Sequence, residues 1–346
     1  MVNSLPQKRS SRVRLYGPPV LLVLAGVALS GFWMFAKTQA ERGLDQWMVQ
    51  EAAAGRVWTC DDRVIGGYPF RIELNCLQPT LRQTGADPFE ATMGRVLAVA
   101  QIYQADLAIL EFEGPFHQKN ADGTFLAAKW ESLRASVHLG ADRTPDRLSV
   151  EIKGAEVESR NAVANGTIRH AEFHARVGSG QIAADDLDVA VAVGGAVFPL
   201  INELTGVSEP MDITLRGSAR QAMLLKRGLV PSLIDQWAQT GGKMIFDEAS
   251  LKQPGFAVSV KGEVTLDAQR RPKGQLELNA TGAERLLAAF GIAGKDKGVT
   301  GLLGALLGQK KSDGTQKAST LKLPVRLGNG KVAVGPIVLA ELGPLY

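Results

Sequence analysis

The longest uninterrupted apolar stretch of the chain is Val20–Ala36, with the sequence VLLVLAGVALSGFWMFA. None of its seventeen residues carries a charge, and Arg14 and Lys37 are the nearest charged residues on its two sides. Counted from Leu15, the stretch has 22 residues, which as a helix measures roughly 33 Å. The hydrocarbon core of a bilayer is about 30 Å thick. The pattern therefore predicts a transmembrane helix over residues 15–36.

Basic residues and no acidic residue precede this stretch: Lys8, Arg9, Arg12 and Arg14. Because basic flanks stay in the cytoplasm, we expect residues 1–14 to form a cytoplasmic tail and the rest of the chain to be exported. A cleaved signal peptide is an alternative, with Thr38-Gln39-Ala40 as a weak cleavage site, although the apolar stretch exceeds the roughly 7–15 residues usual for such a signal. A buried helix of a soluble protein is a third interpretation.

Residues 37–55 continue in a helical pattern, in which Leu44, Trp47, Met48 and Ala52 share one face. The pattern ends at Gly55, a residue typical of helix ends. We expect a juxtamembrane helix that packs on the first sheet. A helix lying on the bilayer surface is the alternative.

Beyond residue 56, short stretches alternate apolar and polar residues. Leu148, Val150 and Ile152, for example, alternate with Ser149 and Glu151. About a dozen such stretches, separated by Gly, Pro, Asp and Asn, predict antiparallel sheets with one apolar and one polar face. We therefore expect a mainly β fold with a few helices (α+β), in which large antiparallel β sheets form a sandwich or a half-open shell. The clearest stretches are 96–100, 106–112, 133–139, 148–152, 171–177, 189–193, 213–215, 244–246, 258–266, 276–280 and 332–339.

Helical patterns interrupt this alternation in four places: 200–205, 221–239, 283–290 and 302–307. Residues 309–319 are predicted to be a polar loop. The β-rich body thus comprises residues 56–346, with a possible subdivision near 200–240.

The two cysteines, Cys60 and Cys76, flank a predicted hairpin with turn residues Gly66–Phe70. If Ile65 pairs with Arg71, Cys60 lies opposite Cys76, within disulfide reach. An exported body is in an oxidising compartment, which favours a bridge. A redox-active pair is the alternative, but it normally has two residues between its cysteines.

Charge excludes one class of partner. The chain has 39 basic and 35 acidic residues. The segment up to Ala36 contributes four basic residues, so the exported part is formally neutral. A neutral body has no electrostatic footprint for nucleic acid.

Candidate chemistry is sparse. His170, Glu172 and His174 would share one face of a strand and are the only metal-like spacing in the chain. Ala171 and Phe173 alternate with them and are expected to face the core, so we predict that the His/Glu face is solvated. Asp61-Asp62 and Asp185-Asp186 are adjacent acids whose side chains would point to opposite faces of a strand. We find no nucleophile elbow, phosphate-binding loop or zinc-protease motif and expect neither an enzyme nor a cofactor.

Several short motifs resemble a known family. They include Trp58-Thr59-Cys60, Ile65–Arg71, Gly241–Met244, Val260–Asp267 and Leu323–Leu327. Together they are similar to the proteobacterial domain of unknown function, family twenty-one twenty-five, over almost the whole chain. The resemblance implies a protein anchored in the bacterial inner membrane by a single helix, with its body in the periplasm, and it assigns no catalytic residue. The run ending Leu266-Asp267, with Arg271-Pro272-Lys273-Gly274, is more remotely similar to AsmA-like envelope proteins. That likeness implies a role in outer-membrane biogenesis and lipid traffic.

We therefore expect a non-enzymatic envelope protein that binds lipid or assists envelope assembly. A half-open shell lined by Ala, Val and Gly would leave room for an acyl chain, whereas the same residues could instead pack the core of a β sandwich. The alternative function is a scaffold that pairs with another envelope protein through a sheet edge or the stripe at Leu233 and Trp237. A metal-dependent envelope hydrolase using His170, Glu172 and His174 is a third hypothesis.

Overall fold

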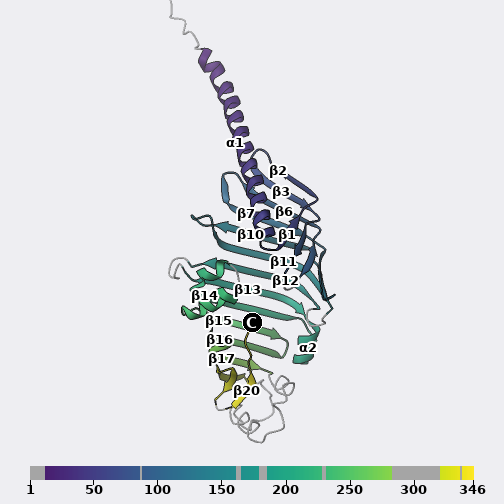
Figure 1. Cartoon of the computed structure of the whole chain (residues 1–346), viewed down its shortest axis with the longest axis vertical. Helices are drawn as coiled ribbons and strands as arrows, with labels where there is room; N and C mark the ends of the chain where they lie inside the picture. The colour runs from purple at the N-terminus through teal and green to yellow at the C-terminus, as the bar shows by residue number, and fades with distance from the viewer. Residues whose placement is uncertain are drawn as a thin grey trace, which may run out of the picture.

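A long helix leads into one large antiparallel sheet in the computed structural model of the protein (Figure 1). The structure describes residues 12–85, 88–160, 165–178, 185–227, 231–282, 320–335 and 337–346. The predicted helices at 283–290 and 302–307 and the predicted loop at 309–319 lie outside these ranges.

The helix, α1, is continuous from Arg12 to Ala53 and has 42 residues. It joins the predicted transmembrane and juxtamembrane segments without a break and ends just before Gly55, whose φ is +82°. Among the described residues it is the one helix long and apolar enough to span a membrane.

Twenty strands of the described chain form the sheet, which is open rather than closed into a barrel. The prediction of a mainly β fold with an N-terminal apolar helix is therefore confirmed. The strands are β1 Arg56–Thr59, β2 Asp62–Gly66, β3 Arg71–Leu77, β4 Thr80–Gln83, β5 Phe89–Thr92, β6 Arg95–Gln101, β7 Gln104–Glu113, β8 Phe116–Asn120, β9 Phe125–Lys129, β10 Ser132–Leu139, β11 Pro145–Ser159, β12 Gly166–Val177, β13 Leu187–Val197, β14 Met211–Arg220, β15 Lys243–Gln253, β16 Phe256–Leu266, β17 Pro272–Thr281, β18 Thr320–Gly328, β19 Lys331–Val334 and β20 Ile337–Glu341.

The sheet branches at β11, the longest strand, with 15 residues. One edge of β11 pairs with β12 along most of its length. The other edge is shared, because β10 pairs with residues 145–153 and β9 with residues 156–159. Two half-sheets therefore meet at β11: half-sheet A, in the order β2–β3–β6–β7–β10, and half-sheet B, in the order β1–β4–β5–β8–β9. From β12 to β20 each strand pairs with the next in sequence, forming a single ladder.

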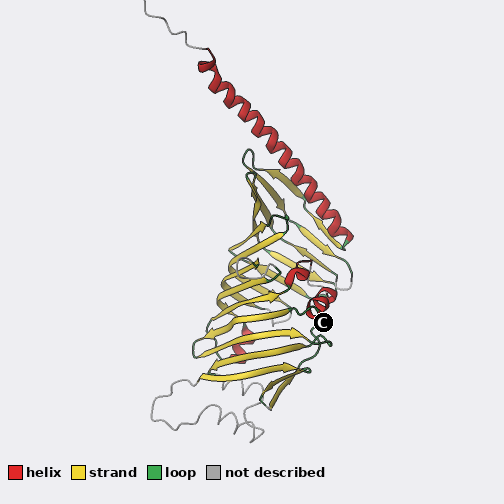
Figure 2. Ribbon diagram, turned by 90° about the vertical axis from the view of Figure 1, so that its left-hand side faces the viewer, coloured by secondary structure: helices red, strands yellow, loops and turns green. Residues whose placement is uncertain are grey.

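Helix α1 lies along the outer strands of both half-sheets (Figures 1 and 2). On half-sheet B, Glu51 accepts hydrogen bonds from Arg56 at 2.5 and 2.7 Å. On half-sheet A, Asp45 accepts one from Arg63 at 2.7 Å. An uncovered edge strand presents unpaired backbone groups that promote aggregation. The helix thus covers two edges that would otherwise be exposed.

A disulfide also joins the half-sheets. Cys60 follows β1 of half-sheet B, and Cys76 lies in β3 of half-sheet A, with their Cα atoms 5.7 Å apart. The predicted bridge is confirmed, but the predicted hairpin register is wrong. Ile65 pairs with Leu74 rather than with Arg71, because the turn after Gly66 is longer than the sequence suggested. Cys60 therefore lies between β1 and β2, outside the β2–β3 ladder.

Two glycines keep apolar side chains on one side of the sheet. In β11, Ile152 lies on the apolar side before Gly154, and buried Ala155 lies there after it. Gly154 has a φ of +60° and Gly195, in β13, has a φ of +64°, a backbone region that side chains disfavour. This shift of phase places Ala196 against Met211, its partner in β14, and both are 0% exposed.

Three short helical segments follow in the described part of the second half of the chain: α2 Pro199–Thr205, the 3₁₀ helix η2 Ala222–Arg227, and α3 Pro231–Gln239. The predicted helix at 200–205 is confirmed, and η2 and α3 are the described helical segments within the pattern at 221–239. α2 lies at one margin of the sheet and α3 at the opposite margin (Figure 1). The sheet itself continues through 200–240, since β13, β14 and β15 pair in sequence. The domain boundaries, including a subdivision near this region, stay predictions.

Replacing both cysteines, Cys60→Ala with Cys76→Ala, should lower the free energy of unfolding by about 3 kcal/mol, because a cross-link of this loop length restricts the unfolded chain. Thermal unfolding of the full chain in detergent, followed by circular dichroism, would measure the loss. A reductant should destabilise the wild type to the same extent and leave the variant unchanged. Equal stability of oxidised wild type and variant would contradict the prediction.

Substituting Met211→Ala should destabilise the body by roughly 2–5 kcal/mol, because it leaves a cavity at a fully buried position. Met223→Ala is the matched control, since Met223 is 41% exposed. Denaturant titration of both variants would test this, and a similar loss in the two would show that burial at Met211 is not the cause.

Candidate functional site

A row of apolar residues, here called the central row, crosses the sheet from β2 to β18. Each member is the direct cross-strand partner of the next, and thirteen strands contribute one residue each. The members are Ile65, Leu74, Ala98, Leu110, Ala135, Val150, Phe173, Val191, Leu215, Ala249, Val260, Leu278 and Leu323. Twelve steps of about 4.8 Å make the row roughly 58 Å long.

Parallel rows flank the central row and widen the apolar side of the sheet, here called the apolar face. One flanking row is Ile152, Ala171, Val193, Ile213, Leu251, Val258 and Ala280. The other is Leu148, Ala175, Val189, Gly217, Phe246, Gly262, Leu276 and Val325. The expected Ala, Val and Gly occur in these rows, together with larger Leu, Ile and Phe residues that were not expected there from the sequence.

The middle of the apolar face is only half-buried. Val150, Phe173, Val191, Leu215 and Val260 all have intermediate exposure, although a sandwich core would bury such side chains completely. Within the described residues, then, no second sheet covers this part of the face. The half-open shell rather than the sandwich describes it.

The two margins of the face are partly covered. At one margin Gln253, beside α2, donates from its side-chain amide to the carbonyl oxygen of Glu209 at 2.9 Å. At the other margin Met223 and Leu224 of η2 line a hollow of about 590 Å³ together with Leu148 and Leu187. The helical segments thus border the apolar face and leave its centre open.

From β11 to β18 the opposite side of the sheet is mainly polar. Its row next to the centre is Glu151, Glu172, Ala192, Thr214, Ser250, Ser259, Asn279 and Lys322. In this part of the sheet, apolar and polar residues are therefore segregated to opposite sides of one layer.

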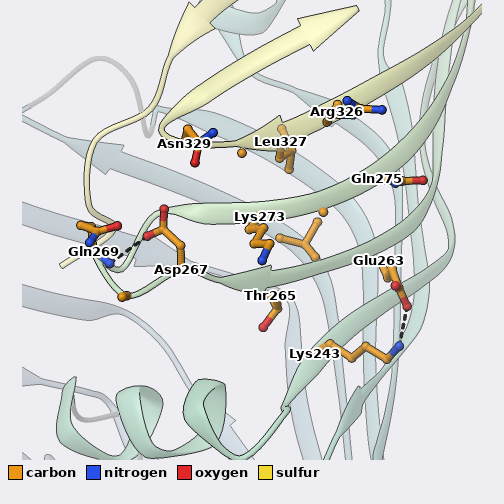
Figure 3. A pocket seen from close by; sticks show the side chains of 14 residues that line it. Lys243, Glu263, Thr265, Asp267, Gln269, Lys273, Gln275, Arg326, Leu327 and Asn329 are labelled. Atoms are coloured by element: carbon orange, nitrogen blue, oxygen red, sulfur yellow. Dashed lines mark hydrogen bonds and ion pairs between the residues drawn. The ribbon is translucent and has the colours of Figure 1, made fainter.

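A hollow of about 670 Å³ lies over β15–β18 on this polar side (Figure 3). In it Lys243 Nζ contacts Glu263 Oε2 at 2.6 Å. The side chain of Arg271 donates to Asp267 Oδ2 at 2.9 Å and lowers the pKa of that carboxyl. Both carboxylates are engaged by cations, so neither is arranged as a general base.

The histidines of β12 form a small cluster with a residue from β11. His170 Nε2 lies 3.2 Å from Glu151 Oε1 and 3.4 Å from Glu172 Oε1, and ligand atoms of these three lie within 4.8 Å of one another. His174 contacts Glu172 Oε2 at 3.3 Å. Glu151 was absent from the predicted triad because it comes from the neighbouring strand, and its place depends on a register that spacing does not reveal.

The cluster is half-exposed, and the negative charge of Glu151 is already balanced by a lysine. Lys153 Nζ lies 2.8 Å from Glu151 Oε1, and its hydrogen bond lowers the pKa of Glu151. A metal ion would have to displace this lysine. The geometry therefore favours the interpretation of a solvated polar face, while a metal site at His170, Glu172 and His174 stays a minor prediction.

We expect equimolar Zn²⁺ to leave the melting temperature of the full chain unchanged, because Lys153 already neutralises Glu151. The variant His170→Ala is the reference. A Zn²⁺-dependent rise of several degrees in the wild type that is lost in His170→Ala would contradict this expectation.

Comparison with known proteins identifies a family but no activity. No curated protein and no solved structure matches the chain, so the AsmA-like resemblance stays a sequence-based expectation. A family described as an uncharacterized protein conserved in bacteria, DUF2125, matches residues 33–342. This range includes the second half of α1 and all the strands of the sheet. The chain belongs to the DUF2125 family.

Proposed function

We propose that the protein is anchored in the bacterial inner membrane by α1, holds its β-rich body in the periplasm, and binds the acyl chains of lipids on the apolar face without catalysing a reaction. The observation that carries this proposal is the central row, which continues without a polar residue from Ile65 to Leu323. It starts on β2, beside the helix that spans the membrane.

The dimensions of the face suit an alkyl chain. Residues two apart on one side of a strand lie about 7 Å from each other, so three rows give a strip roughly 14 Å wide. Each methylene group removed from water contributes about 0.8 kcal/mol. A chain lying on the strip would gain this stabilisation and also shield Phe173 and Leu215 from water.

The open apolar face suits transient binding of a lipid better than its long-term storage. Because the middle of the face is half-buried rather than enclosed, a bound chain would not need a large conformational change to arrive or leave. The segregation of polar residues to the other side of the sheet leaves the lipid face free of hydrogen-bonding groups that an acyl chain could not satisfy.

The absence of catalysis is part of the proposal and is supported by the pairing of acids in the hollow over β15–β18 and in the histidine cluster. Glu263 contacts Lys243, Asp267 accepts hydrogen bonds from Arg271, and Glu151 contacts Lys153. Arg271 lowers the pKa of Asp267 and Lys153 lowers that of Glu151, whereas a typical general acid has a raised pKa.

A scaffold is the second candidate, favoured by one observation. β20 pairs with β19 in the described part of the sheet, and its other edge is open. Val338 and Leu339 of β20 are 49% and 38% exposed, and such an edge can accept a strand from a partner. The predicted stripe at Leu233 and Trp237 is a weaker candidate. Trp237 is 5% exposed and donates from its indole to the carbonyl oxygen of Arg220 at 2.6 Å.

A photo-crosslinking benzoylphenylalanine at Phe173 should form phospholipid adducts when the full chain is illuminated in membranes. The same group at His174 should not, because adjacent strand residues point to opposite faces. Mass spectrometry of the purified protein would detect the adducts. Lipids around α1 do not interfere, since the label lies in β12.

A second pair of variants strengthens this test. Leu215→Asp places a carboxylate on the apolar face, which costs roughly 3 kcal/mol against an acyl chain and should reduce the Phe173 adduct about 100-fold. Thr214→Asp, on the polar side, should leave it unchanged. Adducts of equal yield at Phe173 and His174, or insensitivity to Leu215→Asp, would refute lipid binding by this face.

A further inference from the structure

The β-body contacts α1 inside the apolar stretch, not only beyond it. The turn between β2 and β3 reaches the helix, where the hydroxyls of Ser30 and Tyr68 lie 2.9 Å apart. One turn further on, Trp33 donates from its indole to the carbonyl oxygen of Arg71 at 2.8 Å and packs edge-to-face on Tyr68 with ring centroids 5.4 Å apart. Figure 2 shows the tip of the half-sheet alongside α1.

The position of these contacts along α1 determines how deep the β2–β3 turn lies in the membrane. The uncharged part of α1 ends at Ala36, because Lys37 follows. Ser30 precedes Ala36 by six residues, or about 9 Å of helix. The bare part of the helix, Tyr16–Ala28, measures only roughly 20 Å, too short for a hydrocarbon core of about 30 Å. Residues 29–36 must therefore also lie in the membrane, and the turn that contacts Ser30 lies there with them.

Exposed aromatic side chains occupy this same level. Tyr68 and Phe70 in the β2–β3 turn are 60% and 56% exposed, and Tyr103 in the adjoining β6–β7 turn is 72% exposed. The two turns are neighbours, because the backbone N–H of Ile102 donates to the carbonyl oxygen of Phe70 at 3.0 Å. In water these rings would be unfavourably hydrated, whereas aromatic rings with a polar tip are stable at the headgroup level.

Basic groups lie next to the aromatic residues. Lys37 Nζ lies 5.8 Å from the ring centroid of Trp33. Arg71, which follows Phe70 directly, forms an ion pair with Glu73 and keeps a side chain that is 59% exposed. Both cations are thus close to the height at which lipid phosphates begin. Aromatic side chains below and basic groups above are the arrangement expected at a membrane–water interface.

We propose that the β2–β3 and β6–β7 turns, through Tyr68, Phe70 and Tyr103, insert into the interface of the leaflet on the body side of the membrane. This places Ile65 and Leu74, the first members of the central row, at the lipid surface. The insertion rests on α1 crossing the membrane, which the proposed function shares, and does not depend on lipid binding by the apolar face.

The test uses the full chain in nanodiscs of phosphatidylethanolamine and phosphatidylglycerol, with benzoylphenylalanine at Phe70, Tyr103 or Val338. Val338 is the control, because it is 49% exposed but lies on β20 at the opposite end of the sheet (Figure 1). Phospholipid adducts should be at least tenfold more abundant at Phe70 and Tyr103 than at Val338. All three positions are exposed, so the replacements should not disturb folding.

A second measurement needs no unnatural residue. Tyr103→Trp should increase the quenching of tryptophan fluorescence by lipids brominated in their acyl chains, relative to the wild type, and Val338→Trp should not. Equal adduct yields at the three positions, together with no added quenching in Tyr103→Trp, would overturn the insertion.

The outcomes separate the two proposals. Adducts at Phe70 and Tyr103 without adducts at Phe173 would support insertion and refute lipid binding by the apolar face. Adducts at Phe173 with none at Phe70 and Tyr103 would support lipid binding by the apolar face and refute insertion. The absence of adducts at all of these positions would overturn both.

Discussion

The strict alternation of side chains along each strand is the constraint on which the whole body depends. A shift of one residue in any pair would move a strand's apolar residues to the polar side. Across thirteen strands the central row tolerates no such shift. At Gly154 and Gly195 the backbone adopts a positive φ, and the apolar residues that follow return to the apolar side of the sheet. The fold thus keeps one long side of a single sheet apolar.

Much of this architecture follows from the sequence. The long strands such as β11, β12 and β16 alternate clearly, and the apolar stretch before Lys37 is unmistakable. The sequence did not predict half-sheet B, because its strands are only four or five residues long: β1, β4, β5, β8 and β9. Segments such as Phe116–Asn120 mix apolar and polar residues too briefly to establish a period. Their pairing is decided by tertiary contacts with β11 and α1.

The candidate site, too, could be predicted only in part. Alternation predicted an apolar and a polar face, yet the row itself exists only through cross-strand register, which one sequence does not encode locally. The contact of Glu151 with His170 depends on such a register, and the β2–β3 hairpin has a different register from the one that the residue spacing suggested. The turn contact of Tyr68 with Ser30 joins residues 38 apart and was equally invisible.

The branching at β11 has a consequence for how the body folds. The hairpins β2–β3, β4–β5, β6–β7 and β8–β9 are assigned alternately to half-sheets A and B as the chain proceeds. Neither half-sheet can therefore detach without pulling on the chain of the other. The last strands of the two half-sheets, β10 and β9, find their second partner only when β11 has been made. Residues 56–139 should consequently behave as one cooperative unit that forms late, after β11 has been made.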